Sequence, residues 1–455
     1  MNDHVVIVGG SFGGVIAGRV LSERFDKVTI IERDELPTGP VVRKGVPQGP
    51  HVHGILKLGR DIMDGLFPGF VEETQKEGAL LFDIMDEGAG FGPNGWGIRG
   101  HTSVRGYGVR RPLLEFVARR RLLQIPNVTV VHGRVDGLIV GADRRIEGVK
   151  VSGDAGSSEI RADLVVDTSG RGSGSVGWLE HEGFETPAET IVNGFGGYAS
   201  RLLKVPDDAW PREGLRSIAA LPMPSNTKGA ILYPQDNGLH VVSLFGHSRD
   251  YPPSDEDGFY AFLEQGVTPF IHEVVAKSEP VSEIKTSRAT ANRWRHFEHL
   301  ESPPVGFVVV GDAAAAFNPM AGQGISTSCL AGVTLGATFD EVDGDLTKLT
   351  PLFQTRQAEK MAYPWSVAVG FDSMFPATVG DRPAPTPEQI ETGKLLQVLG
   401  QVATVDLEVA EQLLLANHLF DRSALTTPEM VAKADAWVAE GRVPPHLDPT
   451  TFPST

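Results

Sequence analysis

The sequence predicts an α/β protein that combines a parallel sheet with an inserted antiparallel sheet and a helical C-terminal region. Two apolar runs each lead into glycines and then into a helical pattern. One is Val5–Val8, and the other is Phe307–Val310, which ends at Gly311-Asp312. In α/β proteins, a strand followed by glycines that open a helix holds polar ligands at the carboxyl end of the strand. Between these runs, segments from Gly194 to about Thr286 alternate apolar and polar residues, as antiparallel strands do.

The composition is that of a globular protein with a large core. The chain has 455 residues, of which 41% are hydrophobic and 22% charged, and this length predicts two to three domains. Its formal net charge of −17 argues against nucleic acid or an anionic membrane surface as the main partner.

The cysteine content and the first residues of the chain indicate which kinds of site and which cellular compartment to expect. The single cysteine, Cys329, excludes an intramolecular disulfide framework and a multi-cysteine metal site. We expect it to be a buried, inert thiol, and we expect no bound metal. No apolar run reaches the ~18 residues of a transmembrane helix. The residues that follow Met1 include no basic region of the kind that begins a secretory signal, so we expect a cytoplasmic protein.

The first glycine run has the features of a dinucleotide-binding turn. Gly9 would permit the tight turn after the first strand, and Gly14 would permit close packing of a helix expected at Val15–Arg24. A second strand ends at Glu32, at the spacing of an acid that binds a ribose hydroxyl. The middle position of the pattern is Ser11, which is small enough for a pyrophosphate to approach the backbone. These features favour dinucleotide binding over a purely structural turn.

The loop after the second strand carries positive charge and two histidines. Arg43-Lys44 is placed to meet a pyrophosphate, and Gln48, His51 and His53 supply neutral donors and acceptors. The histidines lack a third acidic or histidine neighbour at metal-ligand spacing. We therefore interpret them as hydrogen-bonded loop residues.

The middle of the chain alternates between glycine-rich, helical and strand-like sequence patterns. Ala79–Gly108 is glycine-rich and has no period, so we expect an irregular crossover there. A helix is expected at Leu113–Leu123, with a proline at its opening. Strands are expected at Val128–His132, Ile146–Val151 and Glu159–Val166, and the last runs into polar residues and glycines near the same ligand.

These patterns group into three regions. We expect a discontinuous ligand-binding domain, a substrate-binding domain with the antiparallel sheet, and a C-terminal region in which apolar residues recur at helical spacing. The expected boundaries are 1–80, 105–175 and 288–345 for the first, 81–104 and 176–287 for the second, and 346–455 for the third.

The stretch Phe307–Ala331 supplies the second half of the ligand site. Asp312 can accept hydrogen bonds from sugar or ribityl hydroxyls. The helix N-terminus after Gly322-Gln323-Gly324 suits negative charge. Taken alone, the stretch is also compatible with an ordinary strand, turn and helix, but the glycine run at the other end of the chain favours a ligand.

These motifs resemble those of the flavoprotein monooxygenases of the para-hydroxybenzoate hydroxylase fold. The first glycine run is similar to their FAD adenosine site, DLVVDTSGRGS to their middle motif, and VVVGDAAAAFNPMAGQG to their second FAD motif, in this order over roughly Met1–Asp340. RKGVPQGPHVHGIL, NRWRHFE and GDAAAAFNPMAGQGIS resemble a bacterial subgroup that includes the squalene-epoxidase-like polyether epoxidases of lasalocid and monensin biosynthesis. The resemblance implies a Rossmann-like FAD-binding domain.

The resemblance also implies which residues hold FAD. The first glycine run would face the pyrophosphate, Glu32 the adenosine ribose and Asp312 the ribityl chain, while the residues after the second glycine turn would lie beside the flavin ring. It points to no catalytic side chain. The implied cofactor-binding residues are Gly9, Ser11, Gly13, Gly14, Glu32, Arg33, Arg43, Arg111, Val135, Asp312, Gly322, Gln323, Gly324 and Ile325.

The implied activity is insertion of one oxygen atom from O2 into a small apolar organic substrate. It would proceed through a flavin C4a-hydroperoxide, by epoxidation or hydroxylation in secondary metabolism. Ser169-Gly170 stands where hydroxylases that accept NADPH directly usually have Asp-Gly, and no second glycine fingerprint follows a strand. We therefore expect electrons from NAD(P)H to arrive through a separate flavin reductase.

Three alternatives remain open at this point. They are an aromatic or quinone hydroxylase that uses NAD(P)H directly, an FAD-dependent polyprenyl reductase, and a non-catalytic FAD-binding electron relay. A flavin-dependent halogenase is not expected, because Trp294 stands alone in RWR and no Trp-x-Trp-x-Ile-Pro segment occurs.

Overall fold

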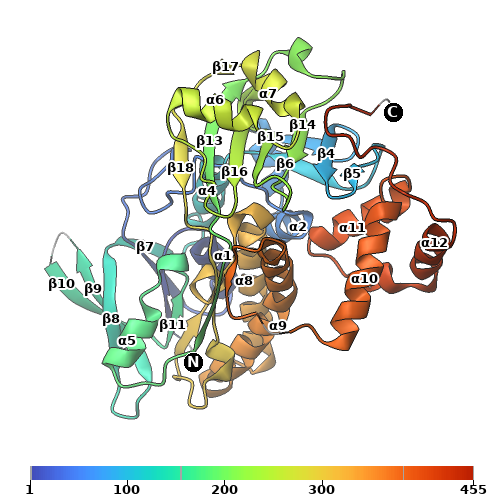
Figure 1. The fold of residues 1–455 in the computed structure, drawn as a ribbon. Helices are drawn as coiled ribbons and strands as arrows, with labels where there is room; N and C mark the ends of the chain where they lie inside the picture. Colours follow the sequence, from blue (N-terminus) through green and yellow to red (C-terminus); the bar gives the residue numbers. More distant parts are fainter. Residues whose placement is uncertain (1–2, 154–155, 383, 454–455) are drawn as a thin grey trace.

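A five-stranded parallel sheet forms the centre of the computed structural model, which describes residues 3–153, 156–382 and 384–453 (Figure 1). One face is covered by α1, α4 and α8, and the other by a three-stranded sheet and α5. Apolar residues alternate between the two faces, so both faces of the sheet are buried. The strand order is β20 (Phe307–Val309), β11 (Leu164–Asp167), β1 (His4–Val8), β2 (Lys27–Glu32) and β7 (Val128–His132).

The helices of this unit pack closely against one another. Helix α8 lies against α1, α2 and α9. A Cβ on Gly332 would lie 2.3 Å from Ile16, and one on Gly336 would lie 2.3 Å from Val20, so glycine lets α8 approach α1. The bounds are α1 Phe12–Leu21, α2 Lys57–Leu66, α3 Phe70–Lys76, α4 Arg111–Leu122, α5 Ser175–His181, α8 Gly324–Glu341 and α9 Leu346–Ser373.

The strand expected at Glu159–Val166 is in fact two strands, and the prediction of one was wrong. β10 (Gly156–Arg161) pairs with β9 (Ile146–Gly153) in an antiparallel sheet with β8 (Arg134–Val140), whereas β11 lies in the central sheet. Between them the Asp163 carboxylate accepts hydrogen bonds from the backbone of His4 and its neighbour, 2.9 and 2.8 Å long. This anchor lets the chain pass from one sheet to the other.

An eight-stranded sheet forms the upper part of the molecule in Figure 1. Its core lies under α6 (Glu256–Glu264) and α7 (Pro269–Ala276), which contribute Phe259 and Val274 to it. Its strands are β17 (Glu279–Pro280), β13 (Gly197–Lys204), β16 (His240–Gly246), β15 (Lys228–Pro234), β14 (Ser217–Ala220), β4 (Gly88–Gly92) and β5 (Gly95–Trp96), with β18 (Lys285–Ser287) also paired to β13.

The expected irregular crossover at Ala79–Gly108 was also wrong, because this segment contains four short strands. β3 (Leu80–Asp83) pairs with β6 (Arg105–Gly108), while β4 and β5 extend the eight-stranded sheet. β4 alternates glycine with apolar residues and lies parallel to β14. Glycines carry no side chain and so leave no hydrophobic period in the sequence.

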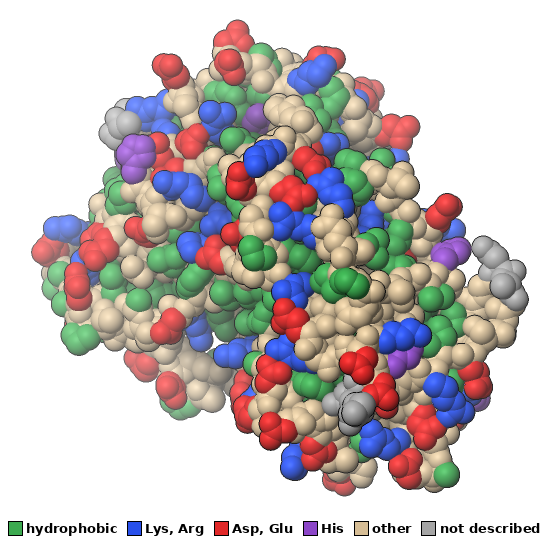
Figure 2. Space-filling view, turned by 180° about the vertical axis from the view of Figure 1, so that it is seen from behind, with side chains coloured by type: hydrophobic (Ala, Val, Ile, Leu, Met, Phe, Trp, Pro, Cys, Tyr) green, Lys and Arg blue, Asp and Glu red, His purple; other side chains and the backbone are tan. Residues whose placement is uncertain are grey.

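A four-stranded sheet and a helical cluster complete the fold. The sheet joins segments distant in sequence: β21 (Ala315–Ala316), β19 (Asn292–Arg295), β12 (Glu189–Asn193) and β22 (Val379–Gly380). Helices α10 (Pro387–Val402), α11 (Leu407–Asn417) and α12 (Pro428–Ala439) enclose a small apolar core of their own. Among the described residues, no helix is long and apolar enough to cross a membrane. Figure 2 shows acidic and basic side chains interspersed over the back of the molecule, with no continuous basic surface on that face.

Candidate functional site

The glycine run after β1 forms a tight cradle at the N-terminus of α1. Gly9 has φ of 101°, which favours glycine, and its N–H donates to the Ile31 carbonyl at 2.8 Å. A Cβ on Gly14 would lie 1.8 Å from the Gly9 carbonyl oxygen, so only glycine fits there. Ser11 caps the helix without a side-chain cap bond. Gly13 lies against Thr168.

Glu32 lies directly beneath this cradle at the end of β2. Its carboxylate accepts hydrogen bonds from the N–H groups of Gly10 (2.8 Å) and Asp34 (2.9 Å), and the residue is 5% exposed. The two backbone bonds fix its orientation at the carboxyl edge of the sheet.

Arg43 is held among three carboxylates. Its Nη1 lies 3.1 Å from Glu32 and 3.2 Å from Asp34, and its Nε lies 3.4 Å from Glu115. Burial acts against the charged guanidinium, but the carboxylates of Glu115 and Glu32 outweigh it and raise the pKa of Arg43. Its Nη2 is buried and, among the described residues, has no hydrogen-bond partner. One donor therefore remains available.

Glu115 joins Arg43 to Arg111, and sequence reasoning missed it. It accepts from Arg111 Nε at 2.8 Å and from the Ser11 hydroxyl at 2.7 Å, and Arg111 Nη2 also donates to Ser11 at 3.0 Å. Burial tends to raise the pKa of Glu115, yet Arg111 and Arg43 hold it below its ordinary value. The only available signal was its i,i+4 spacing from Arg111 on a helix.

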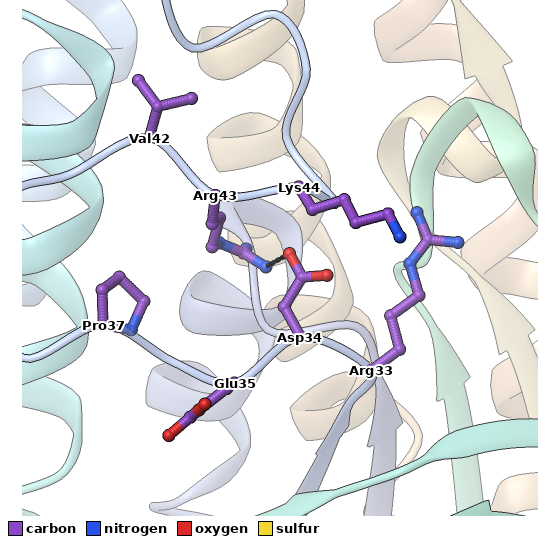
Figure 3. A pocket seen from close by; sticks show the side chains of 7 residues that line it. All are labelled: Arg33, Asp34, Glu35, Pro37, Val42, Arg43 and Lys44. Carbon is purple, nitrogen blue, oxygen red and sulfur yellow. Dashed lines mark hydrogen bonds and ion pairs between the residues drawn. The ribbon is translucent and has the colours of Figure 1, made fainter.

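A cavity of about 390 Å³ opens beside this cluster, after β2. Figure 3 shows Arg33 and Lys44 extending along one side of it, while Arg43 is joined to Asp34. No ion pair involves Arg33 or Lys44 within the described ranges. The wall residues are Arg33, Asp34, Glu35, Pro37, Val42, Arg43 and Lys44.

Asp312 lies at the end of β20, on the same edge of the sheet as Glu32. Its carboxylate forms no hydrogen bond within the part of the chain that the structure describes. Burial raises the pKa of Asp312, while the positive charges of Arg171 and Arg111 oppose this rise. Arg171, also missed at the sequence level, donates to the Phe317 carbonyl at 2.7 Å.

The second glycine turn lies beside Asp312. Gly322 has φ of 66°, and α8 begins at Gly324, where a Cβ would lie 3.7 Å from the Asp312 carboxylate. The Gln323 side chain is 2% exposed, and its Oε1 is buried with no partner among the described residues. Ile325 is buried in the first turn of α8.

The remaining candidates lie at the two ends of this site. Val135 is buried on β8, just after Gly133, whose N–H donates to the Glu32 carbonyl at 2.9 Å. His53 lies beside Arg111, with 3.5 Å between His53 Nε2 and Arg111 Nη1. Burial, with a contribution from Arg111, lowers the pKa of His53 to about 3, so this ring is neutral at pH 7.

A buried polar network behind the second turn was also missed. Asp372, on α9, accepts hydrogen bonds from the side-chain amides of Asn318 (2.8 Å) and Asn292 (2.7 Å) and lies 3.1 Å from His247 Nε2. Asn318 precedes the proline of the second turn. Helix α9 therefore fixes the loop that approaches Asp312.

The comparisons with known proteins identify the family. A sequence family described as FAD dependent oxidoreductase matches residues 4–179. Protein Rv3254 of Mycobacterium tuberculosis is 32% identical over 398 residues, which is 84% of this chain and 82% of that protein. This chain belongs to the FAD-dependent oxidoreductases. Kynurenine 3-monooxygenase of Salinispora tropica is 25% identical to this oxidoreductase over 346 residues, covering 72% of this chain and 70% of that protein.

Solved structures confirm the α/β fold with its Rossmann-like core. A triple mutant of the flavin-dependent brominase Bmp2 matches 97% of this FAD-dependent oxidoreductase and all of that chain, with a TM-score of 0.66 and 14% identity. The p-nitrophenol 4-monooxygenase PnpA from Pseudomonas putida DLL-E4 matches 92% of this chain and 98% of that one, with a TM-score of 0.65 and 17% identity. At these identities the likeness concerns the fold alone.

Proposed function

We propose that this protein is an FAD-dependent monooxygenase that inserts one oxygen atom from O2 into an apolar organic substrate. The observation that carries the proposal is the alignment along one edge of the sheet of Glu32, the glycine cradle and Asp312, whose carboxylate has no hydrogen bond from the described residues. A kynurenine 3-monooxygenase among the relatives supports the reaction class. Epoxidation or hydroxylation in secondary metabolism is the form of the reaction that the subgroup motifs favour.

The residues at this edge fit FAD. The close approach of Gly14 to Gly9 leaves room for a pyrophosphate at the N-terminus of α1, where N–H groups and the helix dipole favour negative charge. Arg43 has on the same side a buried Nη2 without a partner among the described residues, and Arg111 lies next to Ser11. These two arginines would bind the phosphates.

The two ends of the cofactor would be held by different groups. Glu32 would accept from the adenosine ribose, with Arg33 and the backbone of Val135 at the adenine, where the 390 Å³ cavity opens. Asp312 would bind the ribityl chain, because its half-buried carboxylate accepts no hydrogen bond from the described residues. The turn Gly322 to Ile325 would lie at the ring, and the N-terminus of α8 would favour a negatively charged reduced ring.

When bound, FAD supplies the activation of oxygen. The protein must exclude water and hold the substrate. The face of the eight-stranded sheet opposite α6 and α7 carries Tyr198, Ile231 and Phe245, since each alternates with a residue of the helix-covered core. These side chains would form an apolar roof over a substrate.

We further propose that electrons from NAD(P)H reach the FAD through a separate flavin reductase. Position 169 carries a serine hydroxyl instead of a carboxylate, and this hydroxyl donates to Asp167 at 2.6 Å. Anaerobic mixing of the holoprotein with NADPH or NADH tests this point. The oxidised flavin band should persist, and rapid bleaching with or without substrate would refute the separate reductase.

Product analysis under heavy-isotope oxygen gas tests the reaction class. The holoprotein, an added flavin reductase and candidate alkenes or phenols should consume oxygen and yield a product with one labelled oxygen atom. A product that gains two hydrogens would instead indicate a polyprenyl-type reductase. Electron transfer without any product would indicate a relay protein, and either result overturns the proposal.

A further inference from the structure

The loop that contains His51 crosses the face of the eight-stranded sheet that is turned away from α6 and α7. His51 Nδ1 lies 2.9 Å from the Ser200 hydroxyl on β13, and Ser200 lies 2.6 Å from the Ser243 hydroxyl on β16. The Val52 N–H donates to Ser243 at 3.3 Å. Ser200 and Ser243 are paired residues of neighbouring strands, so the sheet itself sets their spacing.

One nitrogen of His51 is left without a partner. The His51 side chain belongs to a residue that is 5% exposed, and its Nε2 is buried with no hydrogen-bond partner among the described residues. A buried polar atom of this kind costs free energy unless something bonds to it.

The serine pair determines which proton His51 carries. The Ser243 hydroxyl oxygen accepts from the Val52 N–H. Among the described residues, the Ser243 hydroxyl proton can be hydrogen-bonded only by donating to the Ser200 oxygen. Ser200 must then donate to His51 Nδ1, which leaves the proton on Nε2. The opposite direction would leave the fully buried Ser243 hydroxyl proton unpaired. Burial lowers the pKa of His51 to about 4, so at pH 7 the ring is neutral, with Nε2–H as a donor.

His51 lies between the roof and the cofactor site. Its ring makes an edge contact with Tyr198, with 4.3 Å between the ring centroids. Two residues along the same loop, His53 Nε2 lies 3.5 Å from Arg111 Nη1, which puts this loop beside the arginine cluster of the cofactor site.

We propose that His51 donates its Nε2–H to an oxygen atom of the substrate. The substrate is then an apolar molecule that carries a hydrogen-bond-accepting oxygen, such as a carbonyl, quinone or phenolic oxygen, rather than a pure hydrocarbon. This inference rests on the proposed monooxygenase function and names the substrate class for that site. His51 acts in it as a positioning and specificity residue.

Binding to the oxidised holoprotein tests the proposal without turnover. Naphthoquinone and naphthalene form a matched pair that differs by the two carbonyl groups, and quenching of intrinsic fluorescence or a shift of the flavin band reports their binding. Wild-type protein should bind naphthoquinone at least about tenfold more tightly, since an unpaired buried donor penalises the hydrocarbon. His51→Phe should abolish this preference, and His51→Gln, which keeps a donor, should retain part of it.

Three results would overturn the proposal. They are a wild-type protein with no preference, a preference that persists in His51→Phe, and a loss of FAD from His51→Phe, which would make the cofactor the acceptor. None of these depends on oxygen incorporation, so failure of the proposed reaction is recognised separately by product analysis. Long-range proton–nitrogen NMR of histidine-labelled wild-type protein gives a test free of any variant: it should show the Nε2–H form for His51, and the Nδ1–H form would refute the argument.

Discussion

Replacing Arg43 by methionine tests the idea that one guanidinium holds the acidic part of the cofactor site together. The Arg43 side chain is 6% exposed and lies 3.1 to 3.4 Å from the carboxylates of Glu32, Asp34 and Glu115. Removing one partner of a buried ion pair typically costs about 3 to 5 kcal/mol, because the other charge stays buried. We expect the lower end of this range.

The reason is that each carboxylate keeps another partner. Glu32 retains its bond from Gly10 N–H, Asp34 accepts from Gly45 N–H at 2.6 Å, and Glu115 remains 2.8 Å from Arg111. The apoprotein should therefore lose about 3 kcal/mol of unfolding free energy. FAD should bind roughly 100-fold more weakly, because the pyrophosphate would meet uncompensated carboxylates and lose a charged donor.

Urea unfolding of the apoprotein and fluorescence titration with FAD measure the two effects separately. Arg134→Met is the matched control, since the Arg134 side chain is 76% exposed and its ion pair within the described ranges is with a half-exposed Asp136. This control should change neither quantity, because exposed ion pairs contribute little. An Arg43→Met protein with unchanged unfolding free energy and unchanged FAD affinity would refute the reasoning.

Three further predictions concern the same site. Asp312→Ala should bind FAD about 10- to 100-fold more weakly by fluorescence titration, with apoprotein stability unchanged or higher, because a half-buried carboxylate with no hydrogen bond from the described residues is removed; normal flavin occupancy would mean that the motif is assigned wrongly. Gly14→Ala should lower the unfolding free energy by about 3 kcal/mol and lower flavin content, because its Cβ would lie 1.8 Å from the Gly9 carbonyl oxygen; a fully flavinated, equally stable variant would contradict this. His51 and His53 have pKa values of about 4 and about 3 in the folded protein, below the ordinary value of 6.5. Because the unfolded chain binds these protons more readily, the unfolding free energy is highest above pH 6.5 and falls as the pH drops toward 4. Each should contribute on the order of 3 kcal/mol to this loss, and NMR should show neither ring titrating between about pH 7.5 and 5.

Local patterns were enough to predict most of the parallel sheet and the groups at its edge. The turn at Gly9, the acid at Glu32 and the strand that ends before Asp312 are each defined by neighbours a few residues away. Strand, turn and helix start are short-range features, since backbone sterics and helix-end hydrogen bonds decide them. Their positions at one edge then follow from parallel pairing.

Features that depend on pairing between distant segments were not predictable in this way. Within Ala79–Gly108, β4 pairs with β14, which lies more than 120 residues further along the chain. The break at Asp163 exists because its carboxylate accepts from the backbone of His4. Segments rich in glycine and short polar residues have no clear hydrophobic periodicity, so their strand pairing cannot be predicted from the sequence.

The sequence alone thus predicted a dinucleotide site at the edge of the sheet, because the turn residues that suit such a ligand are close together in the chain. Only the tertiary structure decided what surrounds it. Glu115 neutralises an arginine 72 residues away, and His51 receives its proton arrangement from Ser200, 149 residues away. Contacts over such separations depend on how sheets and helices pack, and a hydrogen-bond direction depends on every partner in the chain of bonds.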